Sequence, residues 1–275
     1  MGRPGDTVPV KRGGLVVDPE TVANFDFDPG LTERLAPFVE PLYKHYWRID
    51  TEGLEHIPEE SGCLLVANHG GILPFDAAMV KMAVYTKSPP RHAWVLIERF
   101  VQTLPFLNVF FRRTGQVLAC EENTLYLLRR GEVVLVFPEG VRGIAKPHHQ
   151  RYRLQRYGRG GFVRTARLAG VPIIPVAVVG AEEIYRLLAK VHWPFKYLGI
   201  PFLPVTTTFP WLGMLGAIPK PTRWRIRFLP PFTEHLDIPG GVDEDLRIQE
   251  TAEMVRTMTQ DAILDMLRKR RGLYY

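Results

Sequence analysis

A histidine and an aspartate follow the first strongly apolar run of the chain. Residues Cys63 to Ala67 have the continuous hydrophobic pattern of a buried strand, which Asn68 and two glycines interrupt. His69 is therefore expected at the carboxyl end of a strand, where open α/β sheets bind ligands. Asp76 follows at the start of a helical pattern. Such a pair suits general base catalysis, with the carboxylate fixing the imidazole tautomer; the alternative is a buried loop histidine and a helix-capping aspartate.

A second polar group follows another buried strand. Residues 133–137 are wholly apolar and lead into Pro-Glu-Gly-Val-Arg-Gly at 138–143. Glu139 and Arg142 are therefore predicted at the same edge of the sheet as His69. Arg142 can bind a phosphate or a carboxylate with two hydrogen bonds, and Glu139 can accept from a hydroxyl or orient that arginine. Taken alone, Pro-Glu-Gly is also a common turn.

The elements that must position these groups alternate along the chain. Apolar runs predict strands at 63–67, 93–97, 116–119, 133–137 and 171–179, and helical patterns predict helices at 77–85, 100–112, 121–130 and 161–168. Residues 49–56 and 224–229 have the pattern of edge strands. This alternation predicts an α/β fold with a mostly parallel central sheet and helices on both faces.

The rest of the chain is arranged around this alternating region. Residues 1–30 are interpreted as an irregular N-terminal arm, and residues 31–275 as a single domain that begins with a helical segment and ends with a helix at 243–270. Between residues 191 and 221, prolines and aromatic residues occur with few charges. That segment is either a packed excursion over the sheet or a lipid-facing surface, since Trp and Tyr favour the headgroup boundary.

Composition limits the class of protein. With 275 residues, 46% of them hydrophobic, and a net charge of +6, the chain can form one large domain that binds an anionic partner. Cys63 and Cys120 have neither metal-ligand nor disulfide spacing, so we infer a reducing, cytosolic environment and no metal site. No targeting segment or membrane-spanning helix is expected. The aromatic residues lie among prolines rather than in a stacking pattern, which argues against nucleic acid as the partner.

In combination, three stretches resemble the motifs of the phospholipid and glycerol acyltransferase family, whose members include lysophospholipid acyltransferases. Asn68-His69 is similar to the family's catalytic motif, and residues 137–143 are similar to its acceptor-binding motif. Residues 171–176 resemble a third motif, structural or lining the acyl site, through Val171, Pro172 and Pro175. The resemblance covers residues 60–180.

The resemblance implies roles for several residues. His69 would be the general base and Asp76 its carboxylate partner, while Glu139, Gly140 and Arg142 would bind the acceptor. The acyl donor would be acyl-CoA or acyl-carrier protein, used as a co-substrate without any cofactor or metal. From the residues themselves, without the resemblance, we expect backbone N–H groups of the Gly70-Gly71 turn to stabilise the oxyanion, since no side-chain donor is obvious.

Two departures from the family pattern bear on the acceptor. Six residues separate His69 from Asp76, where the family has four, and this longer loop resembles a branch with diacylglycerol-type and phytyl-ester-type acyltransferases. The family's glycerol-phosphate motif has an arginine where this chain has Glu121. An acidic residue repels phosphate, which favours a neutral acceptor such as diacylglycerol or a long-chain alcohol. Arg112 or Arg113 is the candidate substitute if the acceptor is 1-acyl-glycerol-3-phosphate.

Further arginines and the apolar segment suggest where the substrates come from. A basic band after the second motif, which includes Arg159, suits the phosphates of coenzyme A or lipid headgroups; the alternative is a solvated helix face. Its members are Arg151, Arg153, Arg156, Arg159, Arg164 and Arg167. We expect peripheral attachment to the cytoplasmic face of a membrane, and no oligomeric state is assigned. A non-catalytic lipid-binding relative is the alternative outside enzyme chemistry.

Overall fold

A seven-stranded sheet forms the centre of the computed structural model, which describes residues 10–12, 15–17, 20, 24–102, 107–193, 202–270 and 272. The strand order is β3-β11-β8-β4-β7-β5-β6. The strands are β3 (Asp50–Glu52), β4 (Cys63–Ala67), β5 (Ala93–Ile97), β6 (Gln116–Leu118), β7 (Val133–Val136), β8 (Ile173–Val179) and β11 (Arg225–Phe228). β11 is antiparallel to β8, and all other neighbouring pairs are parallel, which confirms the predicted mostly parallel sheet. The prediction that 224–229 is an edge strand is wrong, because β3 pairs with its outer side.

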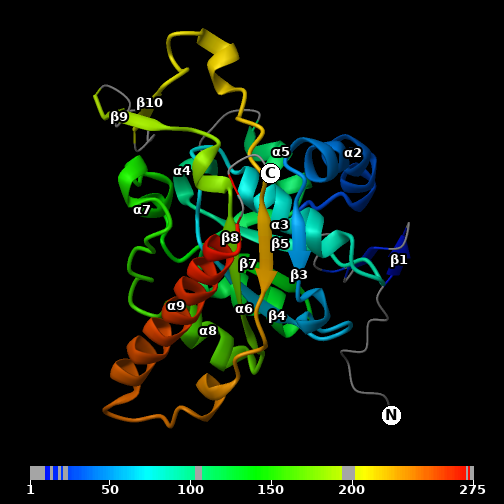
Figure 1. Cartoon of the computed structure of the whole chain (residues 1–275). Helices are drawn as coiled ribbons and strands as arrows, with labels where there is room; N and C mark the ends of the chain where they lie inside the picture. The colour runs from blue at the N-terminus through cyan, green and yellow to red at the C-terminus, as the bar shows by residue number, and fades with distance from the viewer. Residues whose placement is uncertain are drawn as a thin grey trace.

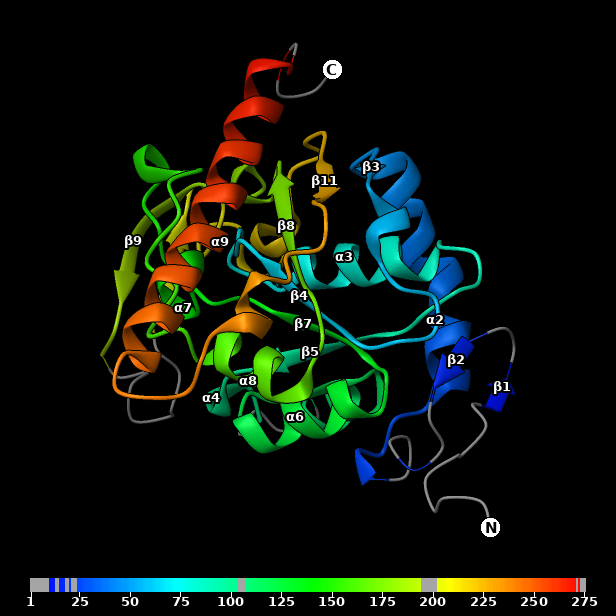
Figure 2. The ribbon, with the colours of Figure 1, turned by 90° about the horizontal axis from the view of Figure 1, so that it is seen from below.

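Helices cover both faces of this sheet (Figure 2). On one face lie α2 (Pro29–Pro41), the π-helical turn η1 (Leu42–Tyr46) and α3 (Phe75–Tyr85). On the other lie α6 (Glu121–Arg129), α8 (Gly161–Ala169) and α9 (Glu244–Arg268). Along β4, Leu64 packs toward the second group of helices and Leu65 toward the first. Since both faces are buried, the central strands are apolar at every position rather than at alternate ones.

The N-terminal region contains more structure than the irregular arm expected from the sequence. Strands β1 (Val10–Arg12) and β2 (Leu15–Val17) pair antiparallel. Phe27 is buried against the rings of His92 and Trp94. The Asp28 carboxylate accepts a hydrogen bond from the Leu31 N–H and so caps α2. The described residues among 1–30 are therefore more regular than the arm that the sequence predicted.

One segment projects from the body of the molecule, as Figure 1 shows at its top. It consists of the antiparallel pair β9 (Leu187–Val191) and β10 (Leu203–Thr206) and the 3-10 helix η6 (Gly213–Ala217). We call the described residues 187–193 and 202–218 the ledge; residues 194–201 of the apolar segment lie outside the described part. Several large apolar side chains of the ledge are exposed, so the expectation of a packed excursion is wrong for them. No helix in the described ranges has the length and hydrophobicity to cross a bilayer.

Candidate active site

The end of β4 is held by a side chain rather than by continued strand pairing. The backbone register between β4 and β8 ends at Ala67 and Val176. Beyond it, the buried Asn68 amide donates to the Val178 carbonyl at 3.0 Å and accepts from the Val178 N–H at 2.7 Å. The amide therefore takes over the backbone's hydrogen bonds, and the chain is free to turn and present His69 at the carboxyl edge of the sheet.

His69 and Asp76 form a hydrogen-bonded pair despite the longer loop between them. The imidazole Nδ1 donates to Asp76 Oδ2 at 2.5 Å, and the ring stacks on Phe137 with 4.4 Å between ring centroids. The histidine side chain is 18% exposed and that of Asp76 is fully buried. With Nδ1 engaged, Nε2 is the nitrogen that a substrate can reach. The prediction that the two side chains lie within hydrogen-bonding distance is confirmed.

The Asp76 carboxylate is fixed by the start of α3. Besides the imidazole, Oδ2 accepts from the Gly70 N–H at 2.9 Å, while Oδ1 accepts from the Ala77 N–H at 2.8 Å. Its place in the first helical turn also favours a negative charge, because the partial charge of a helix N-terminus is positive. Since the Gly70 N–H binds Asp76, it is not available as the oxyanion donor that we expected at the Gly70-Gly71 turn.

Glu139 acts on the site from behind His69. Its buried carboxylate accepts from the His69 N–H at 3.0 Å through Oε1, and from the Gln155 N–H at 2.8 Å through Oε2. Lys146 Nζ also donates to Oε2, at 3.2 Å. The side chain is buried among these protein groups while the residue adjoins a cavity, and the expectation that it contacts the acceptor stays a prediction. Glu139 is a positioning residue that ties the loop after β7 to the loop after β4.

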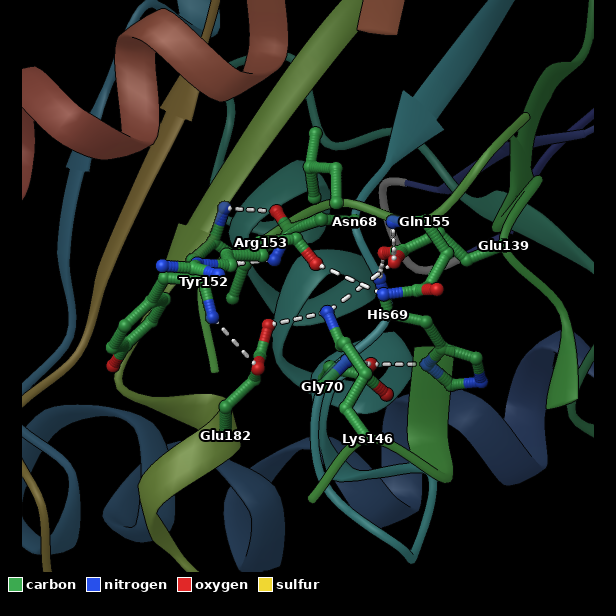
Figure 3. Close-up of polar contacts among 12 residues, drawn as sticks. Asn68, His69, Gly70, Glu139, Lys146, Tyr152, Arg153, Gln155 and Glu182 are labelled. Atoms are coloured by element: carbon green, nitrogen blue, oxygen red, sulfur yellow. Dashed lines mark hydrogen bonds and ion pairs between the residues drawn. The ribbon is translucent and has the colours of Figure 1, made fainter. Parts of the chain in front are cut away.

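A buried lysine joins two carboxylates at this place, and the sequence interpretation missed it (Figure 3). Lys146 Nζ donates to Glu182 Oε1 at 2.8 Å as well as to Glu139, and Glu182 Oε2 accepts from the Tyr152 N–H at 2.9 Å. Burial raises the pKa of Glu182, and the neighbouring Lys146 ammonium opposes that rise. The one available sequence signal was that Glu182 follows β8, at the same edge as His69.

Glycines give this cluster its close packing. A Cβ atom on Gly143 would lie 2.8 Å from the His69 Cβ and 2.9 Å from the Glu139 Cβ. Gly140 has a φ of 54°, which favours glycine and lets the chain turn from β7 into the short helix α7 (Val141–Ile144). The motif therefore needs small residues in order to bring the second loop against His69.

A cavity of about 620 Å³ adjoins Glu139 and Gly140. Three arginines line it, Arg142, Arg156 and Arg159, and all three residues are exposed. Within the described ranges, none of them forms an ion pair with a carboxylate, whereas Glu98 contributes the exposed acidic group of the lining. A concave site with three arginines is suited to a phosphorylated ligand. Arg142 and Arg159 were predicted for such a role.

The other predicted arginines lie elsewhere. Arg112 and Arg113 end α5 (Leu107–Arg113), directly before β6, so they lie at the amino edge of the parallel sheet, opposite to His69. They pair there with Asp26 at 2.6 Å and Asp28 at 2.5 Å. The expectation that either one replaces the missing phosphate-binding arginine is therefore wrong. Glu121 is exposed at the start of α6 and does not line the cavity.

The third motif is part of the sheet. Pro172 accepts a hydrogen bond from the Leu64 N–H, and Pro175 lies within β8, where its carbonyl accepts from the Leu229 N–H. The Val171 carbonyl faces the imidazole of the buried His235, with 2.9 Å between O and Nε2. None of the three lines the arginine cavity. These contacts agree with a structural role for residues 171–176. They do not indicate that the motif lines the acyl site.

Comparisons with known proteins relate this chain to acyltransferases. A family model described as Acyltransferase matches residues 48–179. An uncharacterized protein of Mycobacterium leprae is 37% identical over 93% of this chain and 70% of its own length. A Homo sapiens protein named "DGAT1/2-independent enzyme synthesizing storage lipids" is 30% identical over 58% of this chain and 50% of its own length.

The fold also has a counterpart among solved structures. The crystal structure of the 1-acyl-sn-glycerophosphate (LPA) acyltransferase PlsC from Thermotoga maritima aligns with a TM-score of 0.55. The alignment covers 92% of this chain and 89% of that chain, with 15% sequence identity. At this identity the likeness concerns the fold, and it confirms the predicted α/β architecture.

Proposed function

Because this chain belongs to the acyltransferase family and is an acyltransferase, we propose that it transfers a fatty acyl group from a thioester to the hydroxyl of a neutral lipid. The donor is acyl-CoA or acyl-carrier protein, and the acceptor is diacylglycerol or a long-chain alcohol. The observation that carries the proposal is the 2.5 Å contact between His69 Nδ1 and Asp76, which leaves Nε2 for the substrate.

In the proposed reaction, Nε2 of His69 removes the proton of the acceptor hydroxyl. The oxygen attacks the thioester carbonyl, the tetrahedral intermediate collapses, and the C–S bond breaks. The imidazolium then returns the proton to the leaving thiolate, so that ester and thiol are the products. Asp76 offsets the positive charge of the imidazolium, and such a base contributes about 10²–10⁴-fold in rate.

The acceptor is proposed to be neutral for two reasons. Glu121 stands where the family's motif has its phosphate-binding arginine, and the sheet places Arg112 and Arg113 at the opposite edge. In addition, the human relative is named as an enzyme that synthesises storage lipids. The arginine cavity is then assigned to the phosphates of the donor, for which acyl-CoA supplies several negative charges.

A second candidate is acylation of 1-acyl-glycerol-3-phosphate to phosphatidic acid. The arginine cavity favours it, since Arg142, Arg156 and Arg159 can also bind the phosphate of an acceptor. A non-catalytic lipid-binding role does not explain why Asp76 is buried against His69.

The test offers labelled long-chain acyl-CoA, and in parallel acyl-carrier protein, to the purified protein. The acceptors are diacylglycerol, a fatty alcohol and 1-acyl-glycerol-3-phosphate, with His69→Ala as the control variant. We expect label in the neutral acceptors and none with the variant. Label only in phosphatidic acid would replace the proposal by the second candidate, and transfer that persists in His69→Ala would exclude the base mechanism.

A further inference from the structure

The ledge exposes large apolar side chains on one projecting segment. Trp193, Trp211 and Met214 are 70%, 72% and 86% exposed. The same segment also exposes Leu188, Val191, Leu212, Leu215 and Ile218. A folded protein rarely leaves a group of this kind uncovered unless it meets a partner surface.

Hydrogen bonds within the ledge hold the turn after β10. The Thr206 N–H donates to the Phe209 carbonyl at 2.8 Å, and the Thr208 hydroxyl donates to the Gly216 carbonyl at 2.9 Å. A Cβ on Gly216 would lie 2.6 Å from the Thr208 carbonyl oxygen. These contacts hold the turn in a shape that directs Trp211 and Met214 outward, so their exposure is built into the fold.

The charge around the ledge selects an anionic surface. From residue 184 to residue 233 the sequence contains no Asp or Glu. Arg186 and Lys190 are exposed at β9, and Arg223 is exposed beyond the ledge. A second copy of this chain would bring the same cations against each other, which is unfavourable. Apolar side chains with Trp at their border and cations beside them are the composition of a protein surface that binds anionic bilayers.

The base of the ledge lies beside the catalytic loop. The ledge leaves the sheet after β8, at the carboxyl edge where His69 also lies. A Cβ on Gly71 would lie 3.1 Å from the side chain of Ile184, just before the ledge. On the other side, the Tyr46 hydroxyl donates to the Pro219 carbonyl at 2.5 Å. A membrane that binds the ledge is thus brought close to the loop that carries His69.

We propose that the ledge docks this protein on the surface of an anionic phospholipid bilayer, with Trp193, Trp211, Met214 and Leu215 entering the headgroup boundary. The bilayer is the source of the lipid acceptor, a role that rests on the proposed function. Docking itself depends only on the ledge, so the two can fail separately.

Tryptophan fluorescence gives a direct test. Trp47, Trp94 and Trp224 are fully buried, so Trp193 and Trp211 are the exposed tryptophans. The full chain is mixed with vesicles of phosphatidylcholine and phosphatidylglycerol whose acyl chains are brominated, and with vesicles of phosphatidylcholine alone. We expect a blue shift and quenching with the anionic vesicles, weakened by high salt because salt screens the attraction. Trp211→Phe should remove a large part of the quenching.

A matched pair of variants tests the apolar contribution. Met214→Ser/Leu215→Ser is expected to lower the vesicle partition coefficient at least about tenfold, because two inserted side chains are lost. Val242→Ser/Leu246→Ser removes two exposed apolar side chains near the start of α9 and should leave it unchanged. Circular dichroism verifies that both fold.

Several results would overturn the docking proposal. These are wild-type protein that ignores anionic vesicles, equal binding to neutral vesicles, or a ledge variant that binds like the wild type. A wild-type dimer that the ledge variant converts to monomer, measured by sedimentation without lipid, would assign the ledge to a second copy instead. His69→Gln should still bind vesicles, and the ledge variant should still transfer acyl groups in detergent micelles. Vesicle binding and acyl transfer are thus measured independently, so a failure of the proposed function is distinguished from a failure of docking.

Discussion

Asp76 Oδ2 lies 2.5 Å from His69 Nδ1, although the loop between them is two residues longer than in the family's motif. The carboxylate lies in the first turn of α3, which begins at Phe75. From there the side chain reaches back to the Gly70 N–H and to the imidazole. The two side chains therefore pair across the six residues that separate them.

Asp76→Asn tests the charge of this pair. The amide keeps the shape of the carboxylate but cannot offset an imidazolium, so we expect kcat to fall by about 10²–10⁴-fold. The Tm should fall as well, because the amide NH2 cannot accept the N–H bond that one buried carboxylate oxygen receives. Asp261→Asn, at an exposed position of α9, is the matched control and should leave both quantities unchanged. A kcat near that of the wild type for Asp76→Asn would exclude the proposed role.

Gly143→Ala tests the packing beneath His69. Its added methyl would meet the Cβ atoms of His69 and Glu139 at less than 3 Å, so the imidazole must move. We expect a loss of kcat of at least about tenfold, since small displacements of catalytic groups are costly. Gly161→Ala is the control, because its Cβ meets nothing within 4 Å. Equal activities of the two variants would show that the position of His69 does not depend on Gly143.

Lys146→Met tests the buried charge network. Removal of the ammonium leaves Glu139 and Glu182 without their shared cation, which should lower the free energy of unfolding by about 3–5 kcal/mol. Glu182→Gln added to this variant should restore part of that loss, because one buried charge disappears. The exposed Lys269→Met should change stability by less than about 1 kcal/mol. Urea unfolding of the four proteins measures these differences, and an unchanged Lys146→Met protein would contradict the network's importance.

Much of this site followed from the sequence because its parts obey local rules. Apolar runs gave the strands, and the residues that follow parallel strands meet at one edge, so His69, Glu139 and Arg142 were expected together. Arg112 and Arg113 precede a strand instead of following one. The same rule therefore places them at the opposite edge, away from His69. The contacts of Lys146 with Glu139 and Glu182 were not predictable, because they depend on how a short helix and two loops pack.

The arginine cavity is tested by Arg156→Gln/Arg159→Gln. Loss of two charge-assisted hydrogen bonds should raise the KM for acyl-CoA by about tenfold or more and leave kcat nearly unchanged with a neutral acceptor. Arg112→Gln/Arg113→Gln, at the opposite edge of the sheet, is the control and should leave KM unchanged. If the KM for 1-acyl-glycerol-3-phosphate rises instead, the cavity binds the acceptor.

Lys81 should make stability depend on pH. Burial of its amine, which donates to the Thr114 carbonyl, lowers the pKa of Lys81 to about 7. Between pH 7 and the unfolded pKa of about 10.4, the unfolded chain carries a proton on this amine that the folded protein lacks, so stability increases with pH in that window. Below about pH 7 both states are protonated, and this contribution stays at its lowest value.

Lys81→Met isolates the effect of this amine. The wild type should gain stability relative to the variant by up to about 1.4 kcal/mol for each pH unit between 7 and 10. Burial and the Lys81 charge hold the pKa of the neighbouring His92 well below its usual value. His92 therefore changes the pH dependence of stability only below about pH 6.5, outside this window. Urea unfolding at several pH values measures the difference, with the exposed Lys44→Met as control. A difference that stays constant across the window would show that the Lys81 amine remains charged in the folded protein.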